Sequence, residues 1–314
     1  MYPVRVSVTS EDDLTPTAIA LGNFDGVHLG HQQVIQSLFS ENFSGKCNSL
    51  HPSVVTFSPH PQEFFTGQRR ALLTPLQEKE QYLHGLGIEQ LILLPFNDEI
   101  AQLSPIDFVE QILVQRLGSR AISVGFDFGF GRGRSGTAED LRAIAASFGI
   151  PVTIVPPYCL DNERVSSSAI REALSQGDVQ RGRRLLGRPY CLTGIVQPGQ
   201  QLGRELGFPT ANLLLPLDKF LPHWGVYSVW VEGPMLSQPQ VGVLNIGIRP
   251  TLGTPTLTAE VHLLDWQGDL YHQPLTLHLW EFLRPEQRFA SLTDLKQQIA
   301  RDCDRTRQLL TSLV

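Results

Sequence analysis

The sequence predicts two domains: an α/β domain built on a parallel sheet, then a small antiparallel β-barrel or sandwich that ends in a helix. A chain of 314 residues is longer than one ordinary domain. In its first part, short apolar runs alternate with amphipathic helical patterns, the order that produces a parallel sheet covered by helices. From about residue 187, β-type runs separated by Gly and Pro turns replace that pattern. We therefore expect domains at residues 1–186 and 187–314.

Composition and charge argue against several classes of protein. The formal net charge is −6, whereas a nucleic-acid-binding protein needs a basic surface. The first residues lack the apolar core of a secretory signal, and no run approaches the roughly 18 apolar residues of a membrane span. The four cysteines form no C-x-x-C pair, which favours reduced thiols. We expect a cytoplasmic protein that binds neither nucleic acid nor membranes, and the sequence leaves open whether it forms a homo-oligomer.

In the first domain, the strands are predicted by continuous apolar runs and the helices by apolar residues at three-to-four spacing. Continuous apolar runs are typical of strands that are buried on both faces of a sheet. The expected strands are 18–21, 53–57, 91–96, 121–126 and 152–157, and the expected helices include 33–39, 108–117 and 138–148.

In the second domain, the β-type runs lie at 190–197, 225–233, 240–247, 257–264 and 274–283. A final helix is expected over 291–310, with Ser291 or Thr293 at its start, because Ser and Thr favour helix N-caps. The boundary between the domains is expected within the segment LLGRPY at 185–190.

The stretch GNFDGVHLGH at 22–31 indicates a phosphate site. It follows the first strand and leads into a helix that begins near Gly30. Ligands bind at the carboxyl ends of parallel strands, where a helix N-terminus offers free N–H groups to phosphate. Gly22, Gly26 and Gly30 allow close approach of the backbone, and His28 and His31 can face the same phosphate. The alternative is a turn that carries histidines by chance, but the strand–turn–helix context favours phosphate binding.

His28-Leu29-Gly30-His31 resembles the H-x-G-H signature of nucleotidylyltransferases. The resemblance implies transfer of AMP or CMP from a nucleoside triphosphate to a phosphate acceptor, with pyrophosphate leaving and no covalent enzyme intermediate. The partner motif of that superfamily is matched by ERVSSSAIR at 163–171. Serines that open a helix suit phosphate binding, with an arginine as counter-charge, although such a stretch alone is more often an N-cap. Besides His28 and His31, the ATP-binding residues implied are Gly22, Asn23, Phe24, Asp25, Gly30, Arg164, Ser167, Ser168 and Arg171.

Two further stretches of the first domain bear on the acceptor. TFSPHP at 56–61 follows the second strand, and VGFDFGFGRGRSG at 124–136 follows the fourth. The latter surrounds Asp127 with Phe126, Phe128 and Phe130, a combination that suits a flat heterocycle with N–H groups. Arg132 and Arg134 would suit its phosphate, while the plainer alternative is a core strand followed by a solvated basic turn.

The second domain carries a longer resemblance. TGIVQPGQQLGRELGFPTANL at 193–213 looks like the Gly-rich flap and P-T-A-N segment of riboflavin kinases, and the likeness continues at 225–231, 242–253, 259–266 and 283–302. Together the two halves are similar to the bifunctional bacterial riboflavin kinase/FAD synthetase family over roughly residues 15–312. The resemblance implies a Rossmann-like nucleotidylyltransferase domain followed by a riboflavin kinase barrel with a terminal helix.

The family resemblance also implies residue roles, substrates and a metal ion. Thr210 and Asn212 would bind Mg²⁺–ATP, and Glu260 would be the base that takes the proton of the riboflavin 5′-hydroxyl. His28 and His31 would act on the ATP α-phosphate, with the FMN phosphate as nucleophile. FMN and FAD would be the products. The flap glycines and the proline before the metal ligands are Gly194, Gly203, Gly207 and Pro209, and the flavin-side residues of the first domain are Asp127, Phe126 and Phe128.

Three departures from the family pattern leave alternatives open. Ser168 stands where Thr is usual, Gly129 where Arg is frequent, and Ser58 where Asp is common. The leading hypothesis is a bifunctional enzyme that makes FMN and then FAD. A second is a riboflavin kinase whose first domain adenylylates weakly or not at all. A third is a non-enzymatic flavin-binding or nucleotide-sensing protein.

Overall fold

The computed structural model describes residues 4–7, 14–40, 50–199, 203, 206–249 and 256–311. Contacts between residues divide the chain into two compact units, Met1–Ser167 and Ser168–Val314. The division falls before the boundary expected at residue 186, because the helices between the two positions pack with the second unit. The domain bounds expected from the sequence, 1–186 and 187–314, stay a prediction. Among the described residues, no helix combines the length and apolar composition needed to cross a bilayer.

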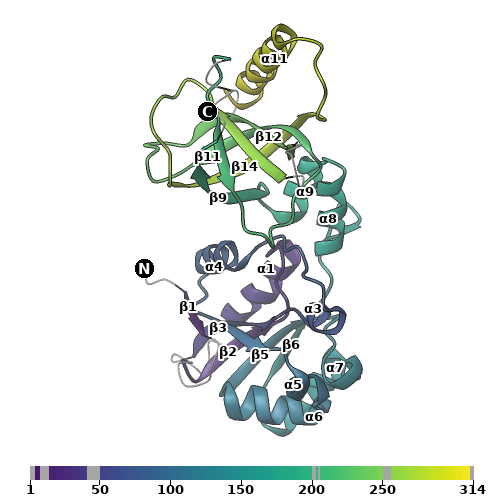
Figure 1. Ribbon diagram of the computed structural model, residues 1–314. Coiled ribbons are helices and arrows are strands. Elements are labelled where there is room, and N and C mark those ends of the chain that lie inside the picture. Colours follow the sequence, from purple (N-terminus) through teal and green to yellow (C-terminus); the bar gives the residue numbers. More distant parts are fainter. Residues whose placement is uncertain are drawn as a thin grey trace. The chain divides into compact units, whose positions relative to one another are not determined.

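The first unit is built on a six-stranded parallel sheet in the order β1-β4-β3-β2-β5-β6 (Figure 1). The five strands expected from the apolar runs are confirmed. The edge strand β1 was not predicted, because three residues are too few to show a pattern. The strands are β1 (Arg5–Ser7), β2 (Thr17–Leu21), β3 (His51–Ser58), β4 (Gln90–Pro95), β5 (Ser119–Gly125) and β6 (Val152–Val155).

The sheet is buried on both faces, which explains the continuous apolar runs. In β2, Ile19 and Leu21 face one hydrophobic cluster, while Ala18 and Ala20 face the other. The small alanines belong to the cluster that includes Val34 of the first helix, where a short side chain lets the helix approach the sheet. The expected α/β class is confirmed.

Helices cover both faces of this sheet (Figure 1). The three helices expected from the sequence are present, although Phe108–Arg116 is a π-helix. A short hairpin, β7 (Cys159–Leu160) and β8 (Glu163–Arg164), leads to the end of the unit. The α-helices are α1 (Leu29–Gln36), α3 (Pro61–Thr66), α4 (Leu76–Gly85), α5 (Asp98–Gln102), α6 (Pro105–Asp107) and α7 (Ala138–Ser147), with 3₁₀ turns at Ser37–Phe39 and Arg132–Arg134.

The strand order fixes where a ligand can bind in the first unit. The chain runs from β2 outward to β3 and β4, and β5 then lies on the other side of β2. The connections therefore leave the sheet in opposite directions at the carboxyl ends of β2 and β5, the position where open α/β sheets bind ligands. The stretches 22–31 and 124–136 start at these two strand ends.

The second unit is a closed six-stranded antiparallel barrel in the order β10-β13-β12-β11-β14-β9, preceded by helices α8 (Ser167–Ser175) and α9 (Val179–Leu186). It is a barrel rather than a sandwich, because β10 pairs with both β9 and β13. This four-residue strand, which begins within the P-T-A-N motif, was not predicted as an element. The strands are β9 (Cys191–Gln197), β10 (Ala211–Leu214), β11 (Gly225–Glu232), β12 (Gln240–Arg249), β13 (Thr256–Leu263) and β14 (Pro274–Arg284).

The expected terminal helix is α11 (Leu292–Thr311), and Ser291 is its N-cap. The Ser291 hydroxyl accepts a hydrogen bond from Asp294 N at 3.1 Å. A buried ion pair ties the helix to the barrel, because Arg284 at the end of β14 donates to both carboxylate oxygens of Asp302, at 2.8 to 3.2 Å. This pair fixes the helix across the end of the last strand.

We expect Asp302→Ala to lower the free energy of unfolding of the barrel by about 3 kcal/mol, because the change leaves the Arg284 guanidinium without its carboxylate in a mostly buried place. Urea unfolding followed by tryptophan fluorescence measures this, since Trp224, Trp230, Trp266 and Trp280 all lie in the second unit. The control is Asp304→Ala on the same helix, whose ion pair with Arg307 is exposed and should contribute less than about 0.5 kcal/mol. Equal losses in the two variants would contradict the assignment.

Candidate active sites

The loop between β2 and α1 has an unusual backbone conformation. Phe24 and Val27 have positive φ angles of 47° and 42°, a region that non-glycine residues rarely adopt. Both side chains are buried in the core, so packing holds the backbone in place. Gly22 N donates to Val55 O of the neighbouring strand at 3.1 Å, which joins the start of the loop to the sheet. The loop is therefore a fixed element rather than a simple turn.

The two histidines of the loop lie together at the N-terminus of α1, as expected. His28 is the N-cap, and its Nδ1 accepts from His31 N at 3.2 Å. The two rings stack with centroids 3.6 Å apart, and the ring of Phe24 meets that of His31 edge-on. A Cβ at Gly30 would lie only 3.3 Å from His28 Nδ1, so glycine there leaves room for the histidine ring. Because Nδ1 accepts, the neutral His28 ring carries its proton on Nε2.

The segment before α4 anchors the next part of the loop. The Asp25 carboxylate accepts from Thr74 N at 3.2 Å, and Gly26 N donates to the Thr74 hydroxyl at 2.8 Å. Asp25 is buried, with 4% of its surface exposed. One carboxylate oxygen of Asp25 therefore helps to hold the loop against the segment before α4.

The serine motif reaches the same loop through Ser167. Its hydroxyl donates to Asp25 O at 2.7 Å, across 142 residues of sequence. Ser168 and Arg171 belong to the second compact unit, so their place at the nucleotide stays a prediction. Arg171 lies near the ring of Phe220 in that unit, with 5.7 Å between its guanidinium carbon and the ring centroid.

Two of the three residues expected on the flavin side, Asp127 and Phe126, lie together with Arg164 on the surface of the first unit. Asp127 accepts from the Arg164 guanidinium at 2.6 Å, and the same guanidinium lies 4.7 Å from the ring centroid of Phe126. Phe128 instead packs on the core and stacks with Phe130 at 5.7 Å between centroids. The structure thus pairs Asp127 with Arg164, two residues expected to contact different substrates.

A cavity of about 500 Å³ lies beside this loop and has aromatic walls. Asn23, Asp25 and Ser167 line it on the loop side. Four aromatic residues of the cavity were not singled out from the sequence; they come from the ends of β3 and β4, from α3 and from the π-helix. They are Phe57, Phe65, Phe96 and Phe108, and Phe130, which the sequence had indicated, lines the cavity with them.

The cavity also shows the surroundings of the Gly129 departure. A Cβ at Gly129 would lie 3.0 Å from Arg134 Nη2, so the Arg134 guanidinium lies directly against this glycine. Both residues line the cavity. A guanidinium therefore stands beside position 129 although the usual arginine is absent. Ser58, the third departure, is exposed and is not among the lining residues.

His60 brings a titratable group to the cavity wall. It is the N-cap of α3, and its Nδ1 accepts from Gln62 N at 3.1 Å. Burial lowers the pKa of His60 and the nearby Arg70 lowers it further, while Asp25 and Glu63 act in the opposite direction. The ring is therefore held neutral, the form that its capping hydrogen bond requires.

In the second unit, the barrel register brings the expected base and metal ligand together. Asn212 of β10 is directly opposite Glu260 of β13, and Asn245 of β12 is opposite Glu260 on its other side. Directly opposite residues on antiparallel strands project from the same face, with Cβ atoms about 5 Å apart. The motifs of three separate segments thus form one row of amide, carboxylate and amide. Asn245 was not singled out from the sequence.

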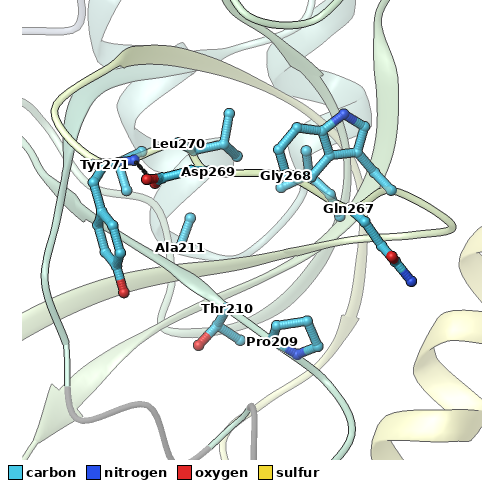
Figure 2. A pocket seen from close by; sticks show the side chains of 11 residues that line it. Pro209, Thr210, Ala211, Gln267, Gly268, Asp269, Leu270 and Tyr271 are labelled. Carbon is cyan, nitrogen blue, oxygen red and sulfur yellow. Dashed lines mark hydrogen bonds between the residues drawn. The ribbon is translucent and has the colours of Figure 1, made fainter.

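Thr210 lines a cavity of about 680 Å³ at one end of β10. Figure 2 shows Pro209, Thr210 and Ala211 on one side of this cavity and the loop from Gln267 to Tyr271 on the other. The loop is held by a hydrogen bond from Tyr271 N to the Asp269 carboxylate, at 2.9 Å. This loop was not predicted from the sequence as part of the site.

The glycines of the expected flap are only partly described, because 200–202 and 204–205 lie outside the described residues. Gly194 is in β9, opposite Leu275 of β14. Gly207 has a φ of 89°. A Cβ at Gly203 would lie 3.2 Å from Thr210 Oγ1 and would clash with Phe208 O, so this glycine lets the flap approach Thr210 closely.

Comparisons with known proteins agree with these two sites. The family model described as FAD synthetase matches residues 10–169, and the model described as riboflavin kinase matches residues 186–310. A protein of Escherichia coli K12 named bifunctional riboflavin kinase/FMN adenylyltransferase is 41% identical over 286 residues, which is 90% of each chain. A protein of the same name from Pseudomonas fluorescens is 41% identical over 290 residues, 92% of this chain and 91% of that one.

A solved structure extends the likeness to the fold. A crystal structure from Streptococcus pneumoniae matches with a TM-score of 0.85 and 30% sequence identity, covering 98% of this chain and 99% of that one. It is described as a macrolide-efflux protein, a description that applies to that protein alone.

The folds, the motifs and these likenesses define a two-domain, nucleotide-dependent transferase of flavin metabolism. The chain belongs to the FAD synthetase family in its first domain and to the riboflavin kinase family in its second. The family resemblance inferred from the motifs is confirmed.

The lowered pKa of His60 predicts how the stability of the first unit changes with pH. Because its folded-state pKa is below the ordinary value of 6.5, the unfolded chain binds the proton more readily. The histidine should therefore make the first unit less stable as the pH falls from 7.5 through about 6. His60→Asn keeps an N-cap acceptor but does not titrate.

We expect the free energy of unfolding of the wild type, relative to His60→Asn, to decrease between pH 7.5 and pH 5.5. Urea unfolding followed by far-UV circular dichroism measures it, with the fluorescence transition of the barrel subtracted. A difference between the two proteins that does not change with pH would mean that folding leaves the pKa of His60 unaltered.

Proposed function

We propose that the first domain transfers AMP from ATP to FMN at the His28–His31 loop, and that the second domain phosphorylates riboflavin at the Asn212–Glu260 row. The activities themselves are those of the two families to which the chain belongs. The residue roles are proposals, and one contact in each unit supports them: Ser167 of the serine motif bonds to the nucleotide loop in the first unit, and Asn212 lies opposite Glu260 in the second. This favours a bifunctional enzyme over a kinase with a silent first domain. It also favours an enzyme over a flavin-binding sensor. We keep the expectation that it works in the cytoplasm.

In the adenylyl transfer, an oxygen of the FMN phosphate attacks the α-phosphorus of ATP and the bond to the β-phosphate oxygen breaks. Pyrophosphate leaves with the electron pair, and no proton has to move. His28 Nε2–H and the N–H groups at the start of α1 would donate to the oxygens of the α-phosphate as negative charge grows there. His31, stacked on His28, would hold that ring in position.

We propose that the aromatic cavity holds the flavin ring of FMN. Its walls offer ring faces and edges, and Asn23 and Asp25 offer polar groups from the nucleotide loop. The cavity lies at the same strand ends as the loop, so a flavin held there would keep its phosphate close to the α-phosphorus. The Asp127–Arg164 pair lies outside the cavity lining and could contact the nucleotide or the ribityl chain from the surface.

In the kinase reaction, the 5′-hydroxyl of riboflavin attacks the γ-phosphorus of ATP, ADP leaves, and Glu260 would accept the hydroxyl proton. Phosphoryl transfer depends chiefly on position and charge neutralisation, so the carboxylate has to orient the alcohol as much as to deprotonate it. The cavity beside Thr210 would hold the nucleotide, with Tyr271 and Asp269 across from it.

A magnesium ion fits the donors at this site. The Thr210 hydroxyl and the Asn212 side-chain oxygen are hard oxygen ligands, to which ATP phosphates would add more. Within the described residues no cluster of three or more His, Cys, Asp or Glu side chains offers a metal cage, so the ion would bind with the nucleotide. Bound there, Mg²⁺ would neutralise phosphate charge.

We expect His28→Ala to reduce FAD formation from FMN and ATP by about 10²–10³-fold, the usual effect of losing one donor to a developing charge. FMN formation from riboflavin should continue, since the kinase motif lies in the other unit. Separating the flavins by chromatography measures both reactions. His51→Ala is the matched control: His51 is a partly exposed histidine of the same unit, paired with Glu89 at the far end of β3. If His28→Ala lost both activities equally, the histidine would hold the fold instead.

We expect Glu260→Gln to reduce FMN formation by about 10²–10⁴-fold, because the amide keeps the shape but cannot accept the proton. FAD formation from supplied FMN should persist. Glu232→Gln, a change at an exposed barrel carboxylate, serves as the control and should phosphorylate riboflavin normally. Normal kinase activity in Glu260→Gln would show that the carboxylate is only a strand residue.

A further inference from the structure

Lys79 is a buried cation of the first unit to which neither proposed reaction assigns a role. It lies on α4 and is 7% exposed. Its Nζ donates to Asn23 O at 2.9 Å, and in the described part of the chain this is the one acceptor for its three N–H donors. Burial lowers the pKa of Lys79, and the nearby Asp25 opposes that shift. Burying an ammonium group with so few hydrogen bonds lowers the stability of the fold. The burial of Lys79 therefore needs a functional explanation.

The carbonyl that Lys79 contacts lies where the nucleotide loop leaves the sheet. Asn23 immediately precedes Phe24, the first residue of the loop with a positive φ. The Thr56 hydroxyl donates to the same carbonyl at 3.3 Å. Fixing the Asn23 carbonyl fixes the peptide plane between Asn23 and Phe24, because that plane is rigid. The strained conformation that follows is therefore set at this peptide.

The same element reaches the loop at a second place. Thr74, just before α4, bonds to Asp25 and Gly26, while Lys79 on the first turn of the helix bonds to Asn23. Three residues of the loop, Asn23, Asp25 and Gly26, are thus held by the segment 74–79. His28 follows two residues after Gly26, so the direction of the loop decides where its ring lies.

We propose that Lys79 is a positioning residue for adenylyl transfer: it holds the Asn23–Phe24 peptide so that the loop 22–31 presents His28 and its backbone N–H groups to the nucleotide. The inference rests on the adenylyl transfer proposed for the first domain. A lysine serves better here than a neutral donor, because its charge adds positive potential to a loop that receives a triphosphate. Lys79 donates to the backbone of the loop, so its proposed action is through that backbone.

The test compares full-length wild type, Lys79→Met and Gln90→Met. Gln90 is a fully buried amide of the same unit whose Oε1 accepts from Leu14 N at 2.7 Å, at the opposite end of the sheet. Both substitutions replace a buried polar side chain with methionine, and only one of them touches the loop. The measurements are kcat and KM for FAD formation from supplied FMN, FMN formation by the same samples, urea unfolding, and hydrogen exchange of peptides that cover 22–31.

We expect Lys79→Met to lower kcat for FAD formation by about 10²-fold, the effect of a misplaced catalytic group. Exchange in 22–31 should become faster, with FMN formation unchanged. Gln90→Met should lose stability but keep a wild-type kcat and wild-type exchange in the loop. The proposal is overturned if Lys79→Met loses no more kcat than Gln90→Met at equal stability, or if exchange in the loop is unchanged.

Thr56→Val covers the case in which Lys79→Met does not fold. It removes the second donor to the same carbonyl, so a several-fold loss of kcat with faster loop exchange supports the proposal, and wild-type values for both overturn it. A wild type that makes no FAD from FMN would refute the proposed function instead. The exchange comparison would then still decide whether Lys79 holds the loop.

Discussion

The first domain depends on holding the loop between β2 and α1 in a conformation that its backbone does not favour. Positive φ angles at Phe24 and Val27 each cost on the order of 1–3 kcal/mol, so the surrounding contacts must outweigh them. The buried rings and methyl groups do part of this, and hydrogen bonds from the 74–79 segment and Ser167 do the rest. Since these partners come from β3, the start of α4 and the last residue of the unit, the site exists only when the whole sheet is formed.

In the barrel, strand register rather than a strained loop positions the proposed catalytic residues. Closure through the short strand β10 puts Asn212 opposite Glu260, and a slip of β10 by one residue would turn Asn212 to the other face. The neighbouring Leu213 is buried and would have to become exposed in such a slip. The packing of the barrel core therefore also keeps the proposed catalytic row in line.

Patterns among neighbouring residues predicted those strands and loops whose conformation depends on neighbouring residues. Apolar runs predicted β2 to β6 because those strands are buried on both faces, and the spacing of His28, Gly30 and His31 predicted a phosphate loop at a helix start. The cavity walls could not be predicted, since Phe57, Phe65 and Phe96 meet only after two strand ends and a helix have been placed in space. The pairing of Asp127 and Phe126 with Arg164 could not be predicted either, because 37 residues separate Asp127 from Arg164, and their contact with flavin stays a prediction. Lys79 was passed over because a lysine in a helix is normally solvated, and its burial depends on the loop above it.

The different chemistry of the two acceptors explains why the two sites need different side chains. The FMN phosphate is already an anion, so adenylyl transfer needs donors that stabilise charge and no base, and the buried carboxylate nearby, Asp25, is bonded to Thr74 N and serves the loop. The riboflavin hydroxyl must lose a proton, and the barrel accordingly places the Glu260 carboxylate between two amides. In the proposed roles, the first site therefore supplies donors to an acceptor that is already ionised, and the barrel supplies a base to an acceptor that still carries a proton.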